Sequence, residues 1–174
     1  MSETIRVGLI GCGGIVHGHV QRLLALPEAK IVALCDPSEA SVQRLKERHP
    51  AVRELPVYRD HRELLEKEKL DAVEIASPHT LHFPQIMDAL SAGLHVLSEK
   101  PMVCTVEHAH QVLRKAEESG KLLLLSYQRH FQGPFRYMRQ RFQNGDMGQL
   151  VFLSALQGQQ WLRGTRGTWR QDPA

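Results

Sequence analysis

Several features are scarce in this sequence, and each absence narrows the function. Only three cysteines occur, Cys12, Cys35 and Cys104. This odd, unpatterned set excludes a disulfide framework and fits small buried thiols in a reducing compartment. No apolar run is long enough to span a bilayer, and the residues after Met1 are not the basic and apolar segments of a secretory signal. We therefore expect a cytoplasmic protein without membrane contact.

The sequence also has little excess of positive over negative charge. The 22 Lys and Arg residues nearly balance the 19 Asp and Glu residues, which leaves a formal net charge of +3 over 174 residues. The densest basic stretch, Arg129 to Arg141, is interrupted by aromatic residues and indicates an amphipathic helix with a solvated basic face. We therefore expect no nucleic acid partner.

The sequence does contain a regular alternation of short apolar runs and helical periods. The helical periods carry an N-cap candidate at Ser38 and helix-ending glycines at Gly93 and Gly120. This alternation predicts an α/β fold, a Rossmann-type doubly wound parallel sheet with right-handed crossovers and helices on both faces. The strand-like runs are residues 5–10, 30–36, 57–60, 71–77, 94–100 and 121–127.

The pattern changes after about Ser126, which predicts a domain boundary. We expect residues 1–126 to form the parallel-sheet domain, and residues 127–174 to be the beginning of an incomplete α+β second domain. Within the second segment, Pro134 opens a predicted helix. Residues 149–161 then resemble a long strand, and no helix pattern follows it. We expect it to be the first strand of a sheet whose other strands are missing from this chain.

A glycine-rich turn between the first strand and the first helix is the strongest local signal. Gly11 permits a tight turn, and Gly13 lets the backbone approach a pyrophosphate. Gly14 and Ile15 then open a helix whose free N–H groups attract the phosphate. Asp36, at the end of the second strand, is placed to accept hydrogen bonds from the adenosine ribose. The pattern predicts dinucleotide binding; the alternative is a glycine-rich turn without a ligand.

The same motif bears on which dinucleotide binds. The carboxylate of Asp36 repels a 2′-phosphate and so favours NAD, while Ser38 and Arg44 nearby leave NADP possible. One departure from the usual pattern is Val16, which stands where Gly or Ala is typical and separates the helix further from the strand.

Residues 77–101 carry a more selective pattern. It comprises Ser77-Pro78, His79, His82 three positions later, the helix end from Ala89 to Gly93, and Glu99-Lys100-Pro101 after the fifth strand. Together with residues 8–20, it resembles the glucose–fructose oxidoreductase, inositol dehydrogenase and rhizopine catabolism (Gfo/Idh/MocA) family, over residues from Ile5 to the end. His79 departs from the Asn common in that family.

The resemblance implies roles for individual residues. Ser77, Pro78, His79, His82 and Glu99 would lie on the cofactor side, and a cis Lys100–Pro101 bond is possible. Lys100 would bind near the nicotinamide and act catalytically, because an ammonium stabilises the alkoxide-like charge that develops when an alcohol is oxidised and can relay its proton. The alternative is a surface lysine at a strand end.

A second element of the family pattern lies near the C-terminus. The resemblance implies that Trp169 and Arg170 lie against the cofactor, the indole over the nicotinamide and the guanidinium at the pyrophosphate. A packing Trp in a loop is equally compatible with the sequence. Arg129 matches a recurrent family arginine whose role is not defined.

The histidine pairs His17/His19 and His79/His82 lack Cys or carboxylate partners at zinc spacing. We therefore expect no metal, and capping or packing roles for His17, His19 and His95.

The resemblance implies an NAD(P)-dependent oxidoreductase acting on a secondary alcohol or ketone of a sugar, cyclitol or related polyol, and a homo-oligomer at full length. Two alternatives remain: a non-catalytic NAD(P)-binding sensor of the same fold, and an NAD-dependent glycosidase. Family members continue with a Gly-rich turn and an Asp and His on one helix, which this chain does not reach. We therefore expect the isolated chain to bind cofactor without appreciable turnover.

Overall fold

The computed structural model describes residues 4–171, apart from the side chain of Leu162. Contacts divide the chain into two compact units, Met1–Ser126 and Tyr127–Ala174. The outermost residues of the two predicted domains, 1–3 and 172–174, lie outside the described residues.

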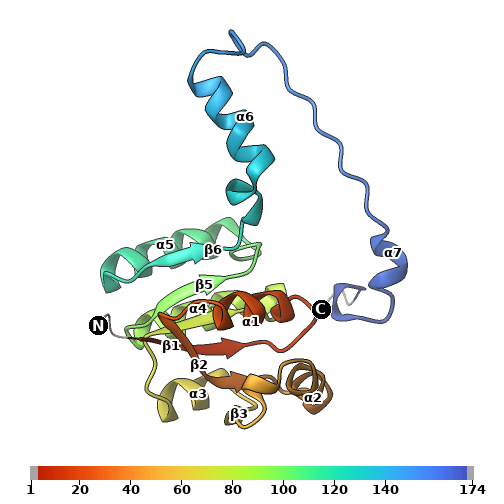
Figure 1. Ribbon diagram of the computed structural model, residues 1–174. Helices are drawn as coiled ribbons and strands as arrows, with labels where there is room; N and C mark the ends of the chain where they lie inside the picture. Colours follow the sequence, from red (N-terminus) through yellow and green to blue (C-terminus); the bar gives the residue numbers. More distant parts are fainter. Residues whose placement is uncertain (1–3, 172–174) are drawn as a thin grey trace. The chain divides into compact units, whose positions relative to one another are not determined.

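A six-stranded sheet in the order β3-β2-β1-β4-β5-β6 forms the centre of the first unit, and every strand pair is parallel (Figure 1). This order is that of a doubly wound fold in which the chain reverses direction across the sheet between β1 and β4. The predicted Rossmann-type sheet is therefore confirmed. The strands are β1 (Ile5–Ile10), β2 (Ala29–Cys35), β3 (Val57–Tyr58), β4 (Ala72–Ile75), β5 (His95–Ser98) and β6 (Leu123–Leu125).

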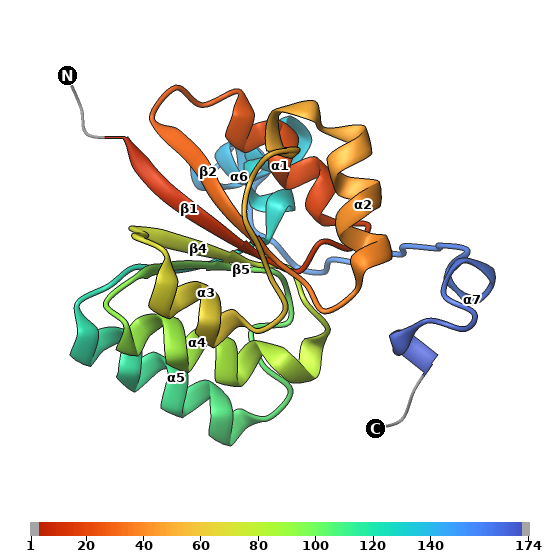
Figure 2. The ribbon, with the colours of Figure 1, turned by 90° about the horizontal axis from the view of Figure 1, so that it is seen from below.

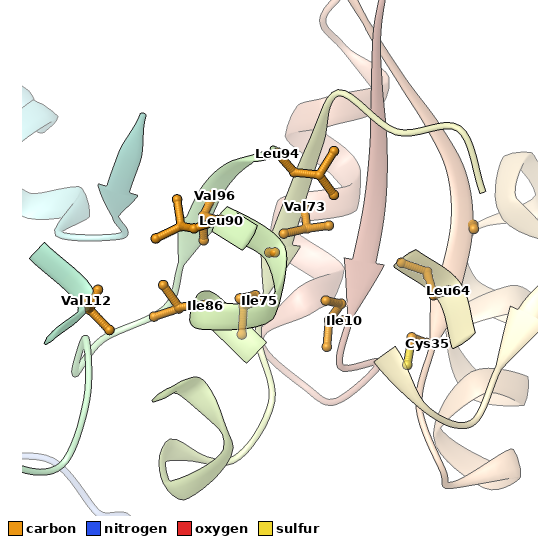
Figure 3. Close-up of a cluster of buried hydrophobic side chains, with 12 residues drawn as sticks. Ile10, Cys35, Leu64, Val73, Ile75, Ile86, Leu90, Leu94, Val96 and Val112 are labelled. Atoms are coloured by element: carbon orange, nitrogen blue, oxygen red, sulfur yellow. The ribbon is translucent and has the colours of Figure 1, made fainter. Parts of the chain in front are cut away.

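Helices cover both faces of this sheet. Figure 2 shows α1 (Val16–Leu24) and α2 (Glu39–Arg48) on one face, with α3 (His61–Lys67), α4 (His82–Ser91) and α5 (Val106–Ser119) on the other. Each face has its own buried core: one includes Val20 and Leu45, and the other, shown in Figure 3, includes Leu64, Ile75 and Ile86. Burying one such side chain contributes about 1.5–3 kcal/mol, which explains why the central strands are apolar on both sides.

The predicted helix ends are found where the sequence placed them. The Ser38 hydroxyl accepts a hydrogen bond from the Ser41 N–H at 3.3 Å and caps α2. Gly93 and Gly120 have φ of +76° and +64°, which satisfies the predicted left-handed conformation. Short 3-10 turns occupy Pro50–Val52 (η1) and His79–Leu81 (η2). Among the described residues, no helix combines the length and apolar character needed to cross a membrane.

The second unit contains η3 (Gln128–Phe131), α6 (Gly133–Gln143), α7 (Trp161–Gly164) and η4 (Trp169–Gln171). The predicted helix at Pro134 is thus present, with the proline in its first turn. The predicted strand over residues 149–161 is wrong, because residues 151–160 form no regular element and the short helices α7 and η4 follow. A strand persists only when a neighbouring strand pairs with its N–H and C=O groups, and no strand within residues 4–171 pairs with this segment.

Candidate cofactor site

The sequence-predicted residues of the first unit gather at one edge of the sheet. Gly11 follows β1, Asp36 follows β2, Ser77 comes just after β4 and Lys100 just after β5. Because all strands are parallel, these positions share the carboxyl edge of the sheet. β1 pairs with both β2 and β4, so the turn at Gly11 lies at the point where the crossovers diverge. Ligands of doubly wound sheets bind at this position.

Gly11 and Gly13 are required for different reasons. Gly11 has φ of +100°, and a Cβ there would lie 2.6 Å from the carbonyl carbon of Ala76 and 2.7 Å from the Ser77 nitrogen. Only glycine can occupy this position without moving the end of β4. At Gly13 and Gly14, by contrast, an added Cβ would meet no atom within 4 Å. The protein fold therefore leaves the backbone at Gly13 and Gly14 open to a ligand.

The N-terminus of α1 follows this turn. Ile15 is its N-cap and offers no side-chain hydrogen bond, and the first turn contains no acidic residue. The first N–H groups of the helix are thus left without a capping side chain, and the partial positive charge of the helix end is not neutralised. Val16, the departure from the usual motif, is buried in the core between α1 and the sheet. This end of α1 can bind an anion such as a diphosphate.

Backbone N–H groups fix the carboxylate of Asp36. One oxygen accepts from the Cys12 N–H at 2.7 Å and the other from the Ser38 N–H at 2.8 Å. Asp36 thereby connects the glycine turn to the start of α2. Each oxygen keeps an acceptor site for a further donor such as a ribose hydroxyl. Burial raises the pKa of the neighbouring Cys12 and Cys35 thiols to about 12, so both remain neutral packing groups.

His82 connects the loops that follow β4 and β5. Its ring is fully buried, with Nδ1 2.7 Å from the Pro101 carbonyl oxygen and Nε2 3.0 Å from the Ser77 carbonyl oxygen. The Ser77 hydroxyl donates to Gln85 at 2.5 Å, and Pro78 precedes η2. The ring of His79 packs edge-on against His82, with centroids 5.8 Å apart. The predicted residues Ser77, Pro78, His79 and His82 therefore form one connected loop cluster.

Glu99 and Lys100 stand beside this cluster. Glu99 is buried, and its Oε2 accepts the Lys100 backbone N–H at 3.2 Å. Lys100 is half-buried, and the Lys100–Pro101 bond is cis, as the sequence allowed. Burial alone would raise the pKa of Glu99, but hydrogen bonds from His19 and from the Lys100 N–H outweigh it and lower that pKa. Glu99 is accordingly ionised at neutral pH.

A buried pair that sequence analysis missed lies behind Glu99. His19 on α1 makes ion pairs with Glu74 on β4 and, through Nε2 at 3.0 Å, with Glu99. The sequence contained a signal for it, since Glu74 is the only charged residue within the otherwise apolar β4 and a buried charge requires a partner. The capping or packing role expected for His19 is therefore wrong, because its ring forms buried ion pairs with two glutamates that are distant in sequence.

Trp169 and Arg170 belong to the second unit. There the Arg170 guanidinium lies over the rings of Trp161 and Trp169, 5.1 and 4.5 Å from their centroids, in cation–π geometry. Arg129 lies over Phe135 at 5.8 Å. The implied contacts of Trp169 and Arg170 with the cofactor remain a prediction.

The histidine pairs do not gather metal ligands in the part of the chain that is described. His17 Nδ1 lies 3.1 Å from His49 Nε2, and residues 4–171 contain no cluster of three or more His, Cys, Asp or Glu side chains fit to hold a metal ion.

The sheet order, the open glycine turn and the anchored Asp36 define a dinucleotide-binding Rossmann domain. Residues 5–127 match the family described as "Oxidoreductase family, NAD-binding Rossmann fold". The chain belongs to this family, the Gfo/Idh/MocA oxidoreductases, as its sequence motifs indicated. The description of this family names NAD as the cofactor of the Rossmann fold, which confirms the predicted cofactor class.

Individual relatives extend the comparison. The chain is 29% identical over 155 residues to D-glucoside 3-dehydrogenase of Escherichia coli, covering 88% of this chain and 43% of that protein. It is 34% identical over 126 residues to alpha-N-acetylgalactosaminidase of Shewanella oneidensis, covering 68% and 27%. The structure of scyllo-inositol dehydrogenase from Lactobacillus casei with NAD(H) and scyllo-inositol matches with a TM-score of 0.77 and 28% identity, covering 84% of this chain and 43% of that one. The chain thus spans less than half the length of these relatives.

Proposed function

We propose that this chain is the cofactor-binding half of an NAD-dependent oxidoreductase. Its substrate would be a secondary alcohol, or the corresponding ketone, of a sugar, cyclitol or related polyol. The names of the similar dehydrogenases, one for a glucoside and one for an inositol, support this substrate class. The isolated chain is expected to bind cofactor but to turn over little substrate.

One observation carries the proposal: the glycine turn and Lys100 lie at the same edge of one parallel sheet. The diphosphate would bind the open backbone at Gly13 and Gly14 and the uncapped start of α1 at Ile15. The ribose near the adenine would bond to the anchored Asp36. The strand order places β4 and β5 on the other side of the turn, where the nicotinamide end of a dinucleotide would extend.

The loop cluster after β4 and β5 would receive that nicotinamide end. Ser77, Pro78 and His79 provide the surface of the cluster. His82 lies inside the cluster, with its ring buried between the Pro101 and Ser77 carbonyl groups of the two loops. Trp169 and Arg170 are proposed to add contacts from the second unit. When bound, NAD would supply the nicotinamide ring that accepts or donates the hydride.

Lys100 is the proposed catalytic residue of this chain. Oxidation of an alcohol removes a hydride from the carbon and a proton from the hydroxyl group. As the proton leaves, negative charge develops on the oxygen. A half-buried ammonium stabilises that charge, and it can relay the proton by giving up one of its own N–H protons before it accepts the hydroxyl proton. Glu99 accepts the backbone N–H of Lys100 and so limits how far the lysine backbone can move.

The preference for NAD over NADP is a further part of the proposal. The Asp36 carboxylate would repel a 2′-phosphate, and its two hydrogen bonds hold it in place. Two cations near this end make NADP use possible: Arg44, whose guanidinium donates to Ser41, and Arg59, whose guanidinium donates to the Pro37 carbonyl at 3.3 Å. Arg44 was a candidate from the sequence, whereas Arg59 is placed near this end only by the fold.

NAD-dependent glycoside cleavage is a second candidate, and one observation favours it. The similarity to the alpha-N-acetylgalactosaminidase, at 34% identity, exceeds the 29% to the glucoside dehydrogenase, although it covers less of the chain. A protein with this activity would release sugar from a glycoside without net NADH formation, whereas a dehydrogenase would accumulate NADH. A non-catalytic sensor would do neither. A coding sequence that continues past codon 174 into a Gly-rich turn and an Asp and His on one helix would favour an enzyme.

Titration of the purified chain with NADH and NADPH, followed by nicotinamide fluorescence and thermal midpoint, tests the proposal. Cofactor at about 100 times Kd adds about 2.7 kcal/mol of apparent stability. We expect NADH to bind more tightly than NADPH. Equal or tighter binding of NADPH would contradict the role given to Asp36. If neither NADH nor NADPH binds, the proposed cofactor site of this chain is wrong. We further propose a cytoplasmic location and a homo-oligomeric whole protein.

A further inference from the structure

A buried chain of charged groups runs from the middle of the sheet to Lys100. It begins at Glu74 in β4, passes through the imidazole of His19 in α1 and reaches Glu99 after β5. Glu99 divides its two oxygens, one to His19 Nε2 at 3.0 Å and the other to the Lys100 N–H at 3.2 Å. Glu74, His19 and Glu99 expose only 3%, 6% and 5% of their surface. These three buried side chains therefore connect α1 with the backbone of Lys100 and are themselves shielded from water.

His19 is required by both carboxylates. Apart from His19 Nδ1, the buried Glu74 Oε1 has no polar partner among the described residues. A carboxylate accepts hydrogen bonds and cannot donate them when ionised, so both ring nitrogens of His19 must carry protons to satisfy both partners. Burial opposes a positive charge on the ring, but the hydrogen bonds and charges of Glu74 and Glu99 raise the pKa of His19 to about 9. The ring is thus a cation at neutral pH.

The same helix begins at the open glycine turn. α1 starts at Val16, directly after the backbone proposed to bind the diphosphate, and His19 lies one turn further on. A single rigid helix therefore presents its N-terminus to the cofactor and its His19 side chain to Glu99. Buried charged hydrogen bonds of this kind hold side chains in one orientation because breaking them leaves a charge without a partner.

We propose that His19 is a positioning residue for Lys100, holding Glu99 so that its carboxylate fixes the Lys100 backbone beside the cofactor. This role rests on the proposed function of Lys100. Glu74 serves as the anchor that keeps the imidazole doubly hydrogen-bonded. The charged groups that face His19 are Glu74 from β4 and Glu99 after β5, and Lys100 in turn acts on Glu99. No bond of the substrate is made or broken by His19 itself.

Nuclear magnetic resonance of the ¹⁵N-labelled chain tests this role through the Lys100 amide and the His19 ring nitrogens. In the unmodified chain, both sets of resonances should move with one shared midpoint near the pKa of about 9. In His19→Gln the Lys100 amide should lose that alkaline step, and its hydrogen exchange should become at least about tenfold faster, since 1.4 kcal/mol of protection corresponds to a factor of ten. In Glu74→Gln the shared midpoint should fall to lower pH.

His17→Gln is the matched control, because His17 lies on the same helix but contacts His49. It should leave the Lys100 amide unchanged. A Lys100 amide that ignores the His19 titration, or that His17→Gln disturbs as much as His19→Gln, would overturn the proposal. If His19→Gln does not fold, the titration of the unmodified chain decides alone. NADH binding in the same samples reports separately on the proposed function, because the amide measurement needs no cofactor.

Discussion

At the scale of single residues, Gly11 and Gly13 show how one residue type meets two demands. Gly11 is buried against the end of β4 and has a positive φ, so the protein itself requires it. Gly13 faces open space, so only a ligand could require it. A motif search treats both alike, whereas the structure separates their effects on stability and on binding.

The two corresponding alanine variants should therefore behave in opposite ways. Gly11→Ala forces a Cβ to within 2.6 Å of backbone at Ala76, and we expect a loss of more than about 2 kcal/mol of unfolding free energy. Gly13→Ala should stay within about 1 kcal/mol of the unmodified chain but weaken NADH binding about tenfold or more. Urea denaturation and fluorescence titration measure the two effects. Unchanged NADH affinity in Gly13→Ala would show that the diphosphate binds elsewhere.

Neutralising Asp36 should change which cofactor is preferred. In Asp36→Asn the repulsion of a 2′-phosphate is lost, and we expect the ratio of NADPH to NADH affinity to rise about tenfold, or 1.4 kcal/mol. Comparative titrations with both cofactors measure this ratio. Glu47→Gln is a suitable control, because Glu47 is an exposed carboxylate of α2 that bonds to Gln43. The assignment fails if both variants keep the original preference.

At the scale of elements, local signals account for where the helices begin and end. Thr105 caps α5, accepting from the His108 N–H at 3.1 Å. Thr105→Ala removes this acceptor and should cost about 1 kcal/mol of unfolding free energy. Ser91→Ala, at the exposed end of α4, removes a hydroxyl that does not cap the start of a helix. It should change the free energy of unfolding by less than about 0.5 kcal/mol. Chemical denaturation of both variants compares them directly, and equal costs would contradict the capping role.

Within the first unit, the strands were predictable in number and order of appearance, but not in length. The apolar run 71–77 contains the strand Ala72–Ile75, and the run 121–127 contains Leu123–Leu125. Apolar character continues past the point where a neighbouring strand stops pairing, so the sequence overestimates the ladder. The same reasoning explains the failure at 149–161, where the run is apolar enough for a strand but has no partner.

The candidate site was predictable to the extent that its residues lie in contiguous motifs. Gly11, Asp36 and Lys100 each stand at the end of an apolar run, and parallel strands bring such ends to one edge of the sheet. The contact of His19 with Glu74 and Glu99 was not predictable in the same way, because three separate elements meet there. Only the folded chain, in which His19 of α1 reaches Glu74 in β4 and Glu99 after β5, defines it.

At the scale of the whole molecule, the buried charges make stability depend on pH. The raised pKa of His19 contributes stability in full below its ordinary value of 6.5, and this contribution is lost as pH rises through about 9. The lowered pKa of Glu99 contributes stability above its ordinary value of 4.5, and this is lost as pH falls through the lowered value. Unfolding free energy should therefore be greatest between about 4.5 and 6.5.

Urea denaturation at pH values from below 4.5 to above 9 checks this expectation. Because one pKa unit corresponds to about 1.36 kcal/mol, the alkaline loss should be at most about 3 kcal/mol. His19→Gln should be less stable at neutral pH and should lack the alkaline slope, while His17→Gln should retain it. An alkaline slope of equal size in His19→Gln would assign the pH dependence to other groups.

The placement of His19 on α1 also constrains the length of the chain, not only its composition. The helix turns about 100° for each residue, so an insertion or deletion between Ile15 and His19 would rotate the imidazole away from the sheet while leaving the glycine turn unchanged. Such a variant would keep every residue of the nucleotide motif and still separate it from Lys100. The interval from Gly11 to His19 therefore acts as a fixed spacer, and homologous chains that alter it would need another residue to reach Glu99.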